Sequence, residues 1–243
     1  AITMVDRGGQ VLVGTSNGTS LLESGCEFCG ACIDTCPVGA LVESDHKWEK
    51  SVKDTYTTCP HCPVGCQTKL EVNKNDTVIR SIGDIDGIPN EGQLCFKGKF
   101  GMEFVNHKKR LTEPMVRKGG NLETTTWKEA ISEIAINLKK YPGKEVAFLA
   151  SPRSTNEETY LLQKFARTVM NTNNVDTTSN TQPELFDQAR EYLGVESVTN
   201  PISDLESANT VMVINSNITE DHNVMAIPIK KGHKAGNKLI VID

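Results

Sequence analysis

This 243-residue chain contains eight cysteines, whose reactive thiols and close spacing make them the first candidates for a functional site. No cysteine follows Cys95. They form two groups, which are Cys26, Cys29, Cys32 and Cys36, and then Cys59, Cys62, Cys66 and Cys95. Disulfides, zinc and iron–sulfur clusters are the three chemistries that such groups serve. Disulfide frameworks belong to small secreted domains, whereas this chain shows no secretory signal and is long enough to bury a core. Metal binding is therefore the favoured interpretation.

The first group reads C-x2-C-x2-C-x3-C-P over residues 26–37. This is the spacing of bacterial ferredoxins, in which a tight loop turns successive thiolates toward a 4Fe–4S cluster. Gly30 allows the backbone to approach the cluster, and loop N–H groups are expected to donate to its sulfurs. Zinc sites usually have two pairs of ligands separated by a longer loop, so this spacing favours iron. Cys36 either closes the same cluster or belongs to another one, whose remaining ligands would lie before Ala1.

The second group has the spacing C-x2-C-x3-C-x28-C. Residues 68–72 alternate in polarity and residues 76–83 form a second strand-like run, which predicts a hairpin that returns Cys95 to the other three thiolates. We predict a second 4Fe–4S cluster here, with a four-cysteine zinc ribbon as the alternative. Lys97 would place a positive charge near this cluster. We interpret His61, which lies inside the motif, as a side chain that packs near the cluster and is not a ligand.

The pattern of apolar and polar residues in the rest of the chain predicts the helices and strands that would position these motifs. An apolar helical stripe begins at Trp127, residues 157–170 and 183–192 also indicate helices, and residues 111–125 form a basic connector with a turn at Gly119 and Gly120. Residues 146–150, 211–214 and 239–242 indicate buried parallel strands. Helices that alternate with short apolar strands predict an α/β domain with a parallel sheet.

The predicted fold is therefore a multidomain combination of α+β and α/β parts. It consists of a ferredoxin-like 4Fe–4S module at residues 1–50, a small β-rich 4Fe–4S module at residues 51–110, and the start of an α/β domain, incomplete at its C-terminus, at residues 111–243. The formal net charge of −5 argues against nucleic acid as a partner. No apolar run approaches the length of a membrane helix, so we expect a cytoplasmic protein without membrane insertion. Both ends suggest a fragment of a longer protein.

The motifs in combination resemble a known family. The second cysteine group, with RLTEPMVRKGG at residues 110–120 and TWKEA at residues 126–130, resembles the iron–sulfur domain of molybdopterin oxidoreductases. Residues 151–160, 163–167 and 172–176 resemble the α subunit of cytoplasmic formate dehydrogenases. Residues 5–8 and 36–41 also resemble the large iron–sulfur subunit of NADH dehydrogenase (complex I).

This resemblance implies a pterin cofactor, molybdopterin guanine dinucleotide, and a site for it. Its guanine nucleotide end would lie at a loop after a parallel strand, which here contains Asn215, Ser216, Asn217 and Glu220. Asn215 stands where a glycine is usual. The chain departs from formate dehydrogenases at residues 182 and 183, where Gln182 replaces the molybdenum ligand and Pro183 the catalytic histidine.

Our main hypothesis is an electron-transfer subunit, or a fragment of one, in a formate dehydrogenase-like or NADH dehydrogenase-like oxidoreductase, without a functional molybdenum site. Its expected partners are flavin-containing or iron–sulfur redox subunits, or a ferredoxin. One alternative is a catalytic molybdopterin-dependent formate dehydrogenase α subunit with an unusual ligand set. The other is a zinc-stabilised structural module with no redox role.

Overall fold

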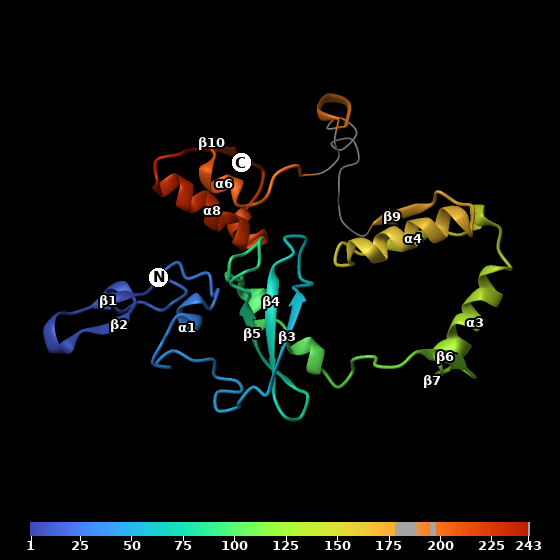
Figure 1. Cartoon of the computed structure of the whole chain (residues 1–243), viewed down its shortest axis with the longest axis horizontal. Coiled ribbons are helices and arrows are strands. Elements are labelled where there is room, and N and C mark those ends of the chain that lie inside the picture. Colours follow the sequence, from blue (N-terminus) through green and yellow to red (C-terminus); the bar gives the residue numbers. More distant parts are fainter. Residues whose placement is uncertain (178–187, 189, 195–197, 243) are drawn as a thin grey trace. The chain divides into compact units, whose positions relative to one another are not determined.

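The computed structural model describes residues 1–177, 188, 190–194 and 198–242 (Figure 1). The chain divides into two compact units, of which one consists of residues 1–105 and 200–243 and the other of residues 106–199. Both helices and strands occur in each unit, which confirms the mixed α and β content that the sequence predicts. Residues 178–187, which include Gln182 and Pro183 and most of the predicted helix at 183–192, lie outside the described part.

The N-terminal part of the first unit has little regular structure. Strands β1 (Thr3–Val5) and β2 (Leu12–Gly14) form an antiparallel hairpin. A single turn of helix, α1 (Ala31–Asp34), follows Gly30, whose φ of 75° starts the helix from the left-handed region that favours glycine. Short 3₁₀ helices lie at Gly8–Gln10 and Ser16–Gly18. Loops with short strands are what the sequence predicts for this part.

A three-stranded antiparallel sheet follows, in the order β3 (Lys53–Thr58), β4 (Gln67–Val72) and β5 (Val78–Gly83) (Figure 1). The predicted hairpin is confirmed as β4 and β5. Asn73 starts its turn, because its side-chain Oδ1 accepts hydrogen bonds from the backbone N–H groups of Asn75 and Thr77. Alternate residues of β4 and β5 are buried, so one face of this sheet supports the core.

The core of the first unit forms around the second group of cysteines. Helix α2 (Phe96–Phe100) begins directly after Cys95 and contacts β5, and a 3₁₀ turn at Glu103–Asn106 follows. The buried side chains of this core are those of Cys59, Val64, Cys66, Leu70, Leu94, Met102 and Val224. Val224 belongs to the C-terminal segment, so residues far apart in the sequence close this core together.

That C-terminal segment contains three helices and two strands, which are α6 (Asp204–Ser207), β10 (Thr210–Ile214), α7 (Ile218–Asp221), α8 (Asn223–Lys234) and β11 (Lys238–Ile242). Strands β10 and β11 are parallel, as predicted, with Thr210 opposite Lys238. The predicted burial is wrong for β11, whose residues 239–242 are all exposed, and holds only in part for β10, in which Val211 and Val213 are half-buried and Met212 and Ile214 are exposed. Among the described residues, β10 and β11 pair only with each other, so no further strand extends this sheet.

The second unit has a hairpin followed by helices and a parallel strand pair. Its elements are β6 (Met115–Lys118), β7 (Asn121–Thr124), α3 (Trp127–Leu138), a 3₁₀ turn (Gly143–Glu145), β8 (Phe148–Ala150), α4 (Asn156–Thr168) and β9 (Val175–Thr177). The predicted connector at 111–125 therefore contains a hairpin, with Gly119 and Gly120 at positive φ in its turn. Capping boxes start α3 and α4.

Strands β8 and β9 pair in parallel, which confirms the predicted strand near residues 146–150 and its orientation. The predicted burial of that strand is wrong at Leu149, which is 69% exposed. None of the described helices combines the length and the apolar character that crossing a bilayer requires.

Candidate metal centres

The four cysteines of the second group lie at the ends of elements that bring them together. Cys59 follows β3, Cys66 precedes β4, and Cys95 precedes α2. The backbone N–H of Cys59 donates to the carbonyl of Cys66 at 2.8 Å, which closes the loop that carries Cys62. All four therefore line one pocket, as the predicted hairpin requires.

Apolar side chains form most of the wall of this pocket. Val64 and Leu94 line it, together with Gly98, and Val224 lies on the wall that the C-terminal segment supplies. A Cβ atom at Gly98 would lie 3.3 Å from Leu94 Cδ2 and 3.7 Å from Cys59 Sγ, so a larger side chain there would crowd the pocket. Polar side chains, those of Asp221, His222 and Asn223, form the rest of the wall, and the apolar part limits the contact of water with a group held by the thiolates.

The electrostatics of the pocket keep its buried thiols neutral unless a cation is bound. Burial raises the pKa of Cys59, and burial together with the neighbouring cysteines raises the pKa of Cys66 to about 12. Such thiols do not ionise together unless a cation compensates the charge, and a metal supplies that compensation. The donor set thus fits a metal group that deprotonates its ligands.

Four thiolates can also hold a structural zinc ion, so the two kinds of metal group have to be compared. A tetrahedral zinc ion with Zn–S bonds of about 2.3 Å holds its sulfurs roughly 3.8 Å apart. Among the described residues, no three His, Cys, Asp or Glu side chains converge as ligands of a single metal ion. The spacing of the four cysteines along the sequence is what favours a 4Fe–4S cluster over a zinc ion here.

Two histidines lie near this pocket in different ways. His61 Nε2 is 3.1 Å from the carbonyl of Gly101, and its ring packs edge-on against Phe104 with centroids 5.8 Å apart. These are the packing contacts that the sequence interpretation expects, and the absence of a ligand role for His61 stays a prediction. His222 lines the pocket itself, and sequence reasoning missed it because only the fold brings the start of α8 to the cysteines.

The first group of cysteines is carried by a loop with unusual backbone conformations. Phe28 and Gly30 both have positive φ, and the N–H of Phe28 donates to Cys26 Sγ at 3.4 Å. Cys32 lies in α1 and is exposed. Backbone N–H groups of residues 38–41 donate to Cys36, with Leu41 the strongest, and lower the pKa of its thiol. These contacts are the N–H donors to sulfur that a cluster loop is expected to supply.

Cys36 also faces a different environment from the rest of its group. It lines a cavity against β4 and β5, to which Glu71, Arg80 and Ile82 contribute, whereas Cys26, Cys29 and Cys32 do not line that cavity. Whether Cys36 binds the same cluster as Cys26, Cys29 and Cys32 or another one stays open, because the sequence spacing allows both.

A buried lysine connects the two groups. Lys99, in α2, has a side chain with no exposed surface, and its Nζ lies 2.6 Å from Asp34 Oδ1 and 2.9 Å from Glu43 Oε1. The ammonium also donates to the carbonyl of Ser81 at 2.9 Å. Lys97, which the sequence favoured as the charge near the cluster, is exposed in the same helix, and its role stays a prediction.

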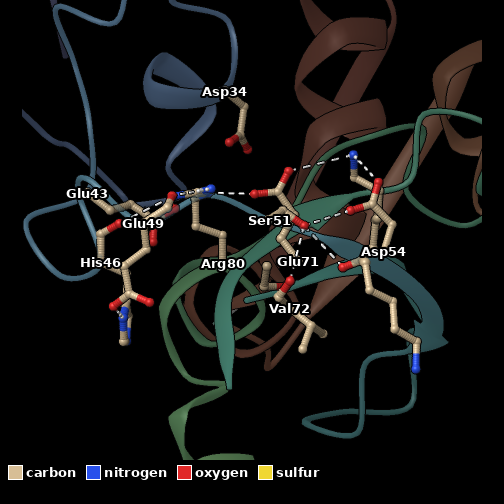
Figure 2. A network of polar contacts seen from close by, with 12 residues as sticks. Asp34, Glu43, His46, Glu49, Ser51, Asp54, Glu71, Val72 and Arg80 are labelled. Carbon is tan, nitrogen blue, oxygen red and sulfur yellow. Dashed lines mark hydrogen bonds and ion pairs between the residues drawn. The ribbon is translucent and has the colours of Figure 1, made fainter. Parts of the chain in front are cut away.

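A second cation fixes the segment after the first group to the sheet. Figure 2 shows Arg80, on β5, between Glu71 of β4 and the segment that contains Glu43, His46 and Glu49. Its Nε lies 2.6 Å from Glu71 Oε2, and its guanidinium donates to the carbonyls of His46 at 3.4 Å and Glu49 at 3.2 Å. Lys99 and Arg80 thus hold residues 34–49 against β5.

Helix α8 forms a third connection between the two groups. Glu27, between Cys26 and Cys29, accepts hydrogen bonds from Asn223 and from Lys230. Asn223 also lines the pocket of the second cysteine group. One residue therefore contacts the first motif and the wall of the second site.

The loop predicted to bind the pterin follows β10. Asn215 has a φ of 46°, and its N–H donates to the carbonyl of Ile242 at 2.8 Å. A left-handed residue at this position explains why a glycine is usual there. Ser216, Asn217 and Glu220 are exposed, and α7 then leads directly to the residues that line the cysteine pocket. Their contact with a pterin stays a prediction.

Two cysteine groups of cluster-binding spacing, connected by buried contacts within one unit, define an iron–sulfur protein. Residues 21–42 match a 4Fe-4S binding domain, residues 52–107 match the molybdopterin oxidoreductase Fe4S4 domain, and residues 110–243 match molybdopterin oxidoreductase. The chain belongs to the molybdopterin oxidoreductase family. The resemblance and the two predicted 4Fe–4S clusters are confirmed, and the third match is consistent with a pterin cofactor.

Its relatives include subunits of oxidoreductases. The chain is 42% identical over 193 residues to the F420-dependent formate dehydrogenase 2 subunit alpha of Methanococcus maripaludis, covering 79% of this chain and 28% of that protein. It is 34% identical to an NADH-quinone oxidoreductase subunit of Rhizobium meliloti over 82% of this chain and 23% of that protein. It is 33% identical to the NADPH-Fe(3+) oxidoreductase subunit alpha of Geobacter sulfurreducens over 100% of this chain and 29% of that protein. The chain thus spans less than a third of the length of these relatives, which are subunits of redox enzymes.

Proposed function

We propose that this chain is the electron-transfer part of a formate dehydrogenase-like or NADH dehydrogenase-like oxidoreductase subunit. The observation that carries the proposal is the joining of two cysteine sites, through Lys99 and Asn223, within one unit of a family of redox enzymes. Two redox sites held close together are what a relay needs, and the family matches assign a 4Fe–4S domain to each cysteine group, which disfavours a structural zinc module.

Each cysteine group would hold one cluster, and a 4Fe–4S cluster takes up and releases single electrons when bound. The residues of this chain do the rest. Val64, Leu94 and Val224 limit the contact of water with the second site, and the backbone N–H of His61 donates to Cys59. At the first site, backbone N–H groups of residues 38–41 stabilise the thiolate of Cys36. Hydrogen bonds of this kind stabilise the reduced form of a cluster.

The proposed organisation has three modules, at residues 1–50, 51–110 and 111–243. The family matches at 21–42, 52–107 and 110–243 support this division, whereas the compact units group residues 200–243 with the N-terminal part. We infer that the last module is an α/β domain with a parallel sheet, for which the parallel pairs β8–β9 and β10–β11 are the support.

A functional molybdenum site is not part of the proposal. Gln182 and Pro183 stand where the resemblance implies a thiolate or selenolate ligand and a histidine, and neither can serve as these groups do. The second candidate function, a catalytic molybdopterin enzyme with an unusual ligand set, is favoured by the left-handed Asn215 and the loop that runs from it to the cysteine pocket. In that case Asn215, Ser216, Asn217 and Glu220 would contact the pterin.

The proposed partners are redox subunits with a flavin or further iron–sulfur clusters, or a ferredoxin, in the cytoplasm. Three relatives are themselves named as subunits, which supports a redox complex in general.

Analysis of iron, zinc, molybdenum and acid-labile sulfide in the intact, anaerobically purified protein tests the proposal. We expect about four irons and four sulfides for each cysteine group, without molybdenum. Molybdenum together with iron would favour the enzyme alternative. Zinc without sulfide would refute the proposal and leave the structural module.

A further inference from the structure

Lys99 is tied at its backbone to a cysteine of the second group. It lies one helical turn after Cys95 in α2, and its N–H donates to the carbonyl of Cys95 at 2.9 Å. Its side chain is completely buried, so its position is fixed by the protein and not by solvent. A displacement of Lys99 would therefore also move the backbone at Cys95.

The other end of the same side chain contacts the loop of the first group at two points. The ammonium forms a 2.6 Å ion pair with Asp34, which lies between Cys32 and Cys36. The aliphatic stem packs against Gly30, where a Cβ atom would come within 2.6 Å of Lys99 Cγ. Lys99 thus contacts the second group through its backbone and the loop of the first group through its side chain.

The negative charges around the Lys99 ammonium outnumber its single positive charge. Asp34 and Glu43 place two carboxylates beside one buried cation, and the carbonyl of Ser81 completes its contacts. Burial of charged groups is costly, and a well-packed apolar contact often holds two surfaces together as well or better. A buried cation is favoured where negative charge arrives nearby, because the attraction is strong in a region that excludes water.

We propose that Lys99 is a positioning residue for electron exchange between the two cysteine sites. It sets their separation through its contacts with Cys95, Gly30 and Asp34, and its charge favours the reduced state of both clusters. The proposal rests on the proposed function. In the exchange, one cluster is oxidised by one electron as the other is reduced by one, and dithionite supplies the electrons in the test.

The test is a redox titration of the intact protein under anaerobic conditions, followed by EPR. Lys99→Met leaves two carboxylates without their cation, so we expect both midpoint potentials to fall. Glu43→Gln removes one negative charge, so we expect the potentials to rise. A tenfold change in the ratio of reduced to oxidised cluster corresponds to ~59 mV for a one-electron couple. Lys74→Met is the matched control, because Lys74 is exposed in the turn between β4 and β5 and should change neither potential.

Opposite shifts in Lys99→Met and Glu43→Gln distinguish an electrostatic role from a purely structural one, which would move both variants in the same direction or leave both potentials unchanged. Either of those results would overturn the proposal. Lys99→Arg keeps the charge and should stay closer to the wild type than Lys99→Met. If Lys99→Met fails to retain iron, Glu43→Gln decides alone, and an unchanged potential there refutes the role. Failure of the proposed function is distinguishable, since the wild type would then lack iron and sulfide.

Discussion

At the scale of single residues, a few buried side chains from other parts of the first unit connect the two cysteine groups. The cysteine spacings of both groups are local patterns, so they could be read without the fold. Lys99 was missed because burial depends on tertiary contacts, although a lysine four residues after Cys95 shares its helical face and was a usable signal. His222 and Asn223 offered no such signal, because only the fold of residues 200–243 brings them to the pocket.

The packing of Gly30 against Lys99 gives a prediction with a close internal control. Gly30→Ala and Gly25→Ala both place alanine at a left-handed φ, 75° and 70°, in the loop around Cys26. That conformation costs roughly 1–2 kcal/mol for either variant. Only Gly30→Ala also collides with the lysine stem, because nothing lies within 4 Å of a Cβ atom at Gly25. We expect Gly30→Ala to destabilise the protein by about 1–3 kcal/mol more, measured by chemical denaturation. Equal losses would contradict the packing described.

At the scale of elements, the sequence predicts the type and direction of strands better than their burial. The hairpin of β4 and β5 and the parallel pair of β10 and β11 are confirmed, because alternation and apolar runs report on strands directly. The predicted burial was wrong for β11 and held only in part for β10 because burial depends on which layers cover a sheet, and a local apolar run carries no information on that. The hairpin of β6 and β7 was missed for a related reason, since its strands are short and polar.

The side chain of Asn90 fixes the loop that positions Cys95, and this role can be tested. Its buried side chain accepts from the N–H of Gln67 at 2.7 Å and donates to the carbonyls of Gln67 and Gln93, so it fixes the loop that returns Cys95 to β4. Asn90→Ala should cost about 1–3 kcal/mol, since it leaves these backbone groups without their partner. We also expect faster loss of iron to a chelator from the second site alone. Asp86→Ala, in an exposed part of the same loop, is the control, and equal iron loss in both variants would refute this role.

At the scale of the whole molecule, the first unit is assembled from both ends of the described chain. Residues 200–243 pack with residues 1–105, and α8 contacts the first motif through Glu27 and the second pocket through Asn223 and Val224. No local pattern predicts such an arrangement, because it depends on contacts across more than half of the sequence. It places the predicted pterin loop and both cysteine sites within one unit, which is the arrangement that an electron path requires.

Formate oxidation is the activity that the sequence at residues 182 and 183 predicts to be lacking. The resemblance implies that Gln182 and Pro183 stand where a molybdenum ligand and a histidine would, so we predict that the complete protein oxidises formate slowly at best. Loss of positioned acid–base catalysis alone typically costs roughly 100- to 10,000-fold in rate. The assay is formate-dependent reduction of viologen dye by the anaerobic complex, with dithionite reduction of the clusters as control. Robust turnover with molybdenum present would promote the enzyme alternative.

The central claim, that two separate 4Fe–4S sites lie in this chain, is tested most directly by EPR of reciprocal cysteine variants. We measure the dithionite-reduced intact protein and its variants Cys29→Ser and Cys95→Ser, with iron content determined on the same samples. Each variant should lose a different low-potential signal and about four irons, while the signal of the other group remains. If both variants keep every signal, or if both lose the same one, the assignment of two sites to these eight cysteines is wrong.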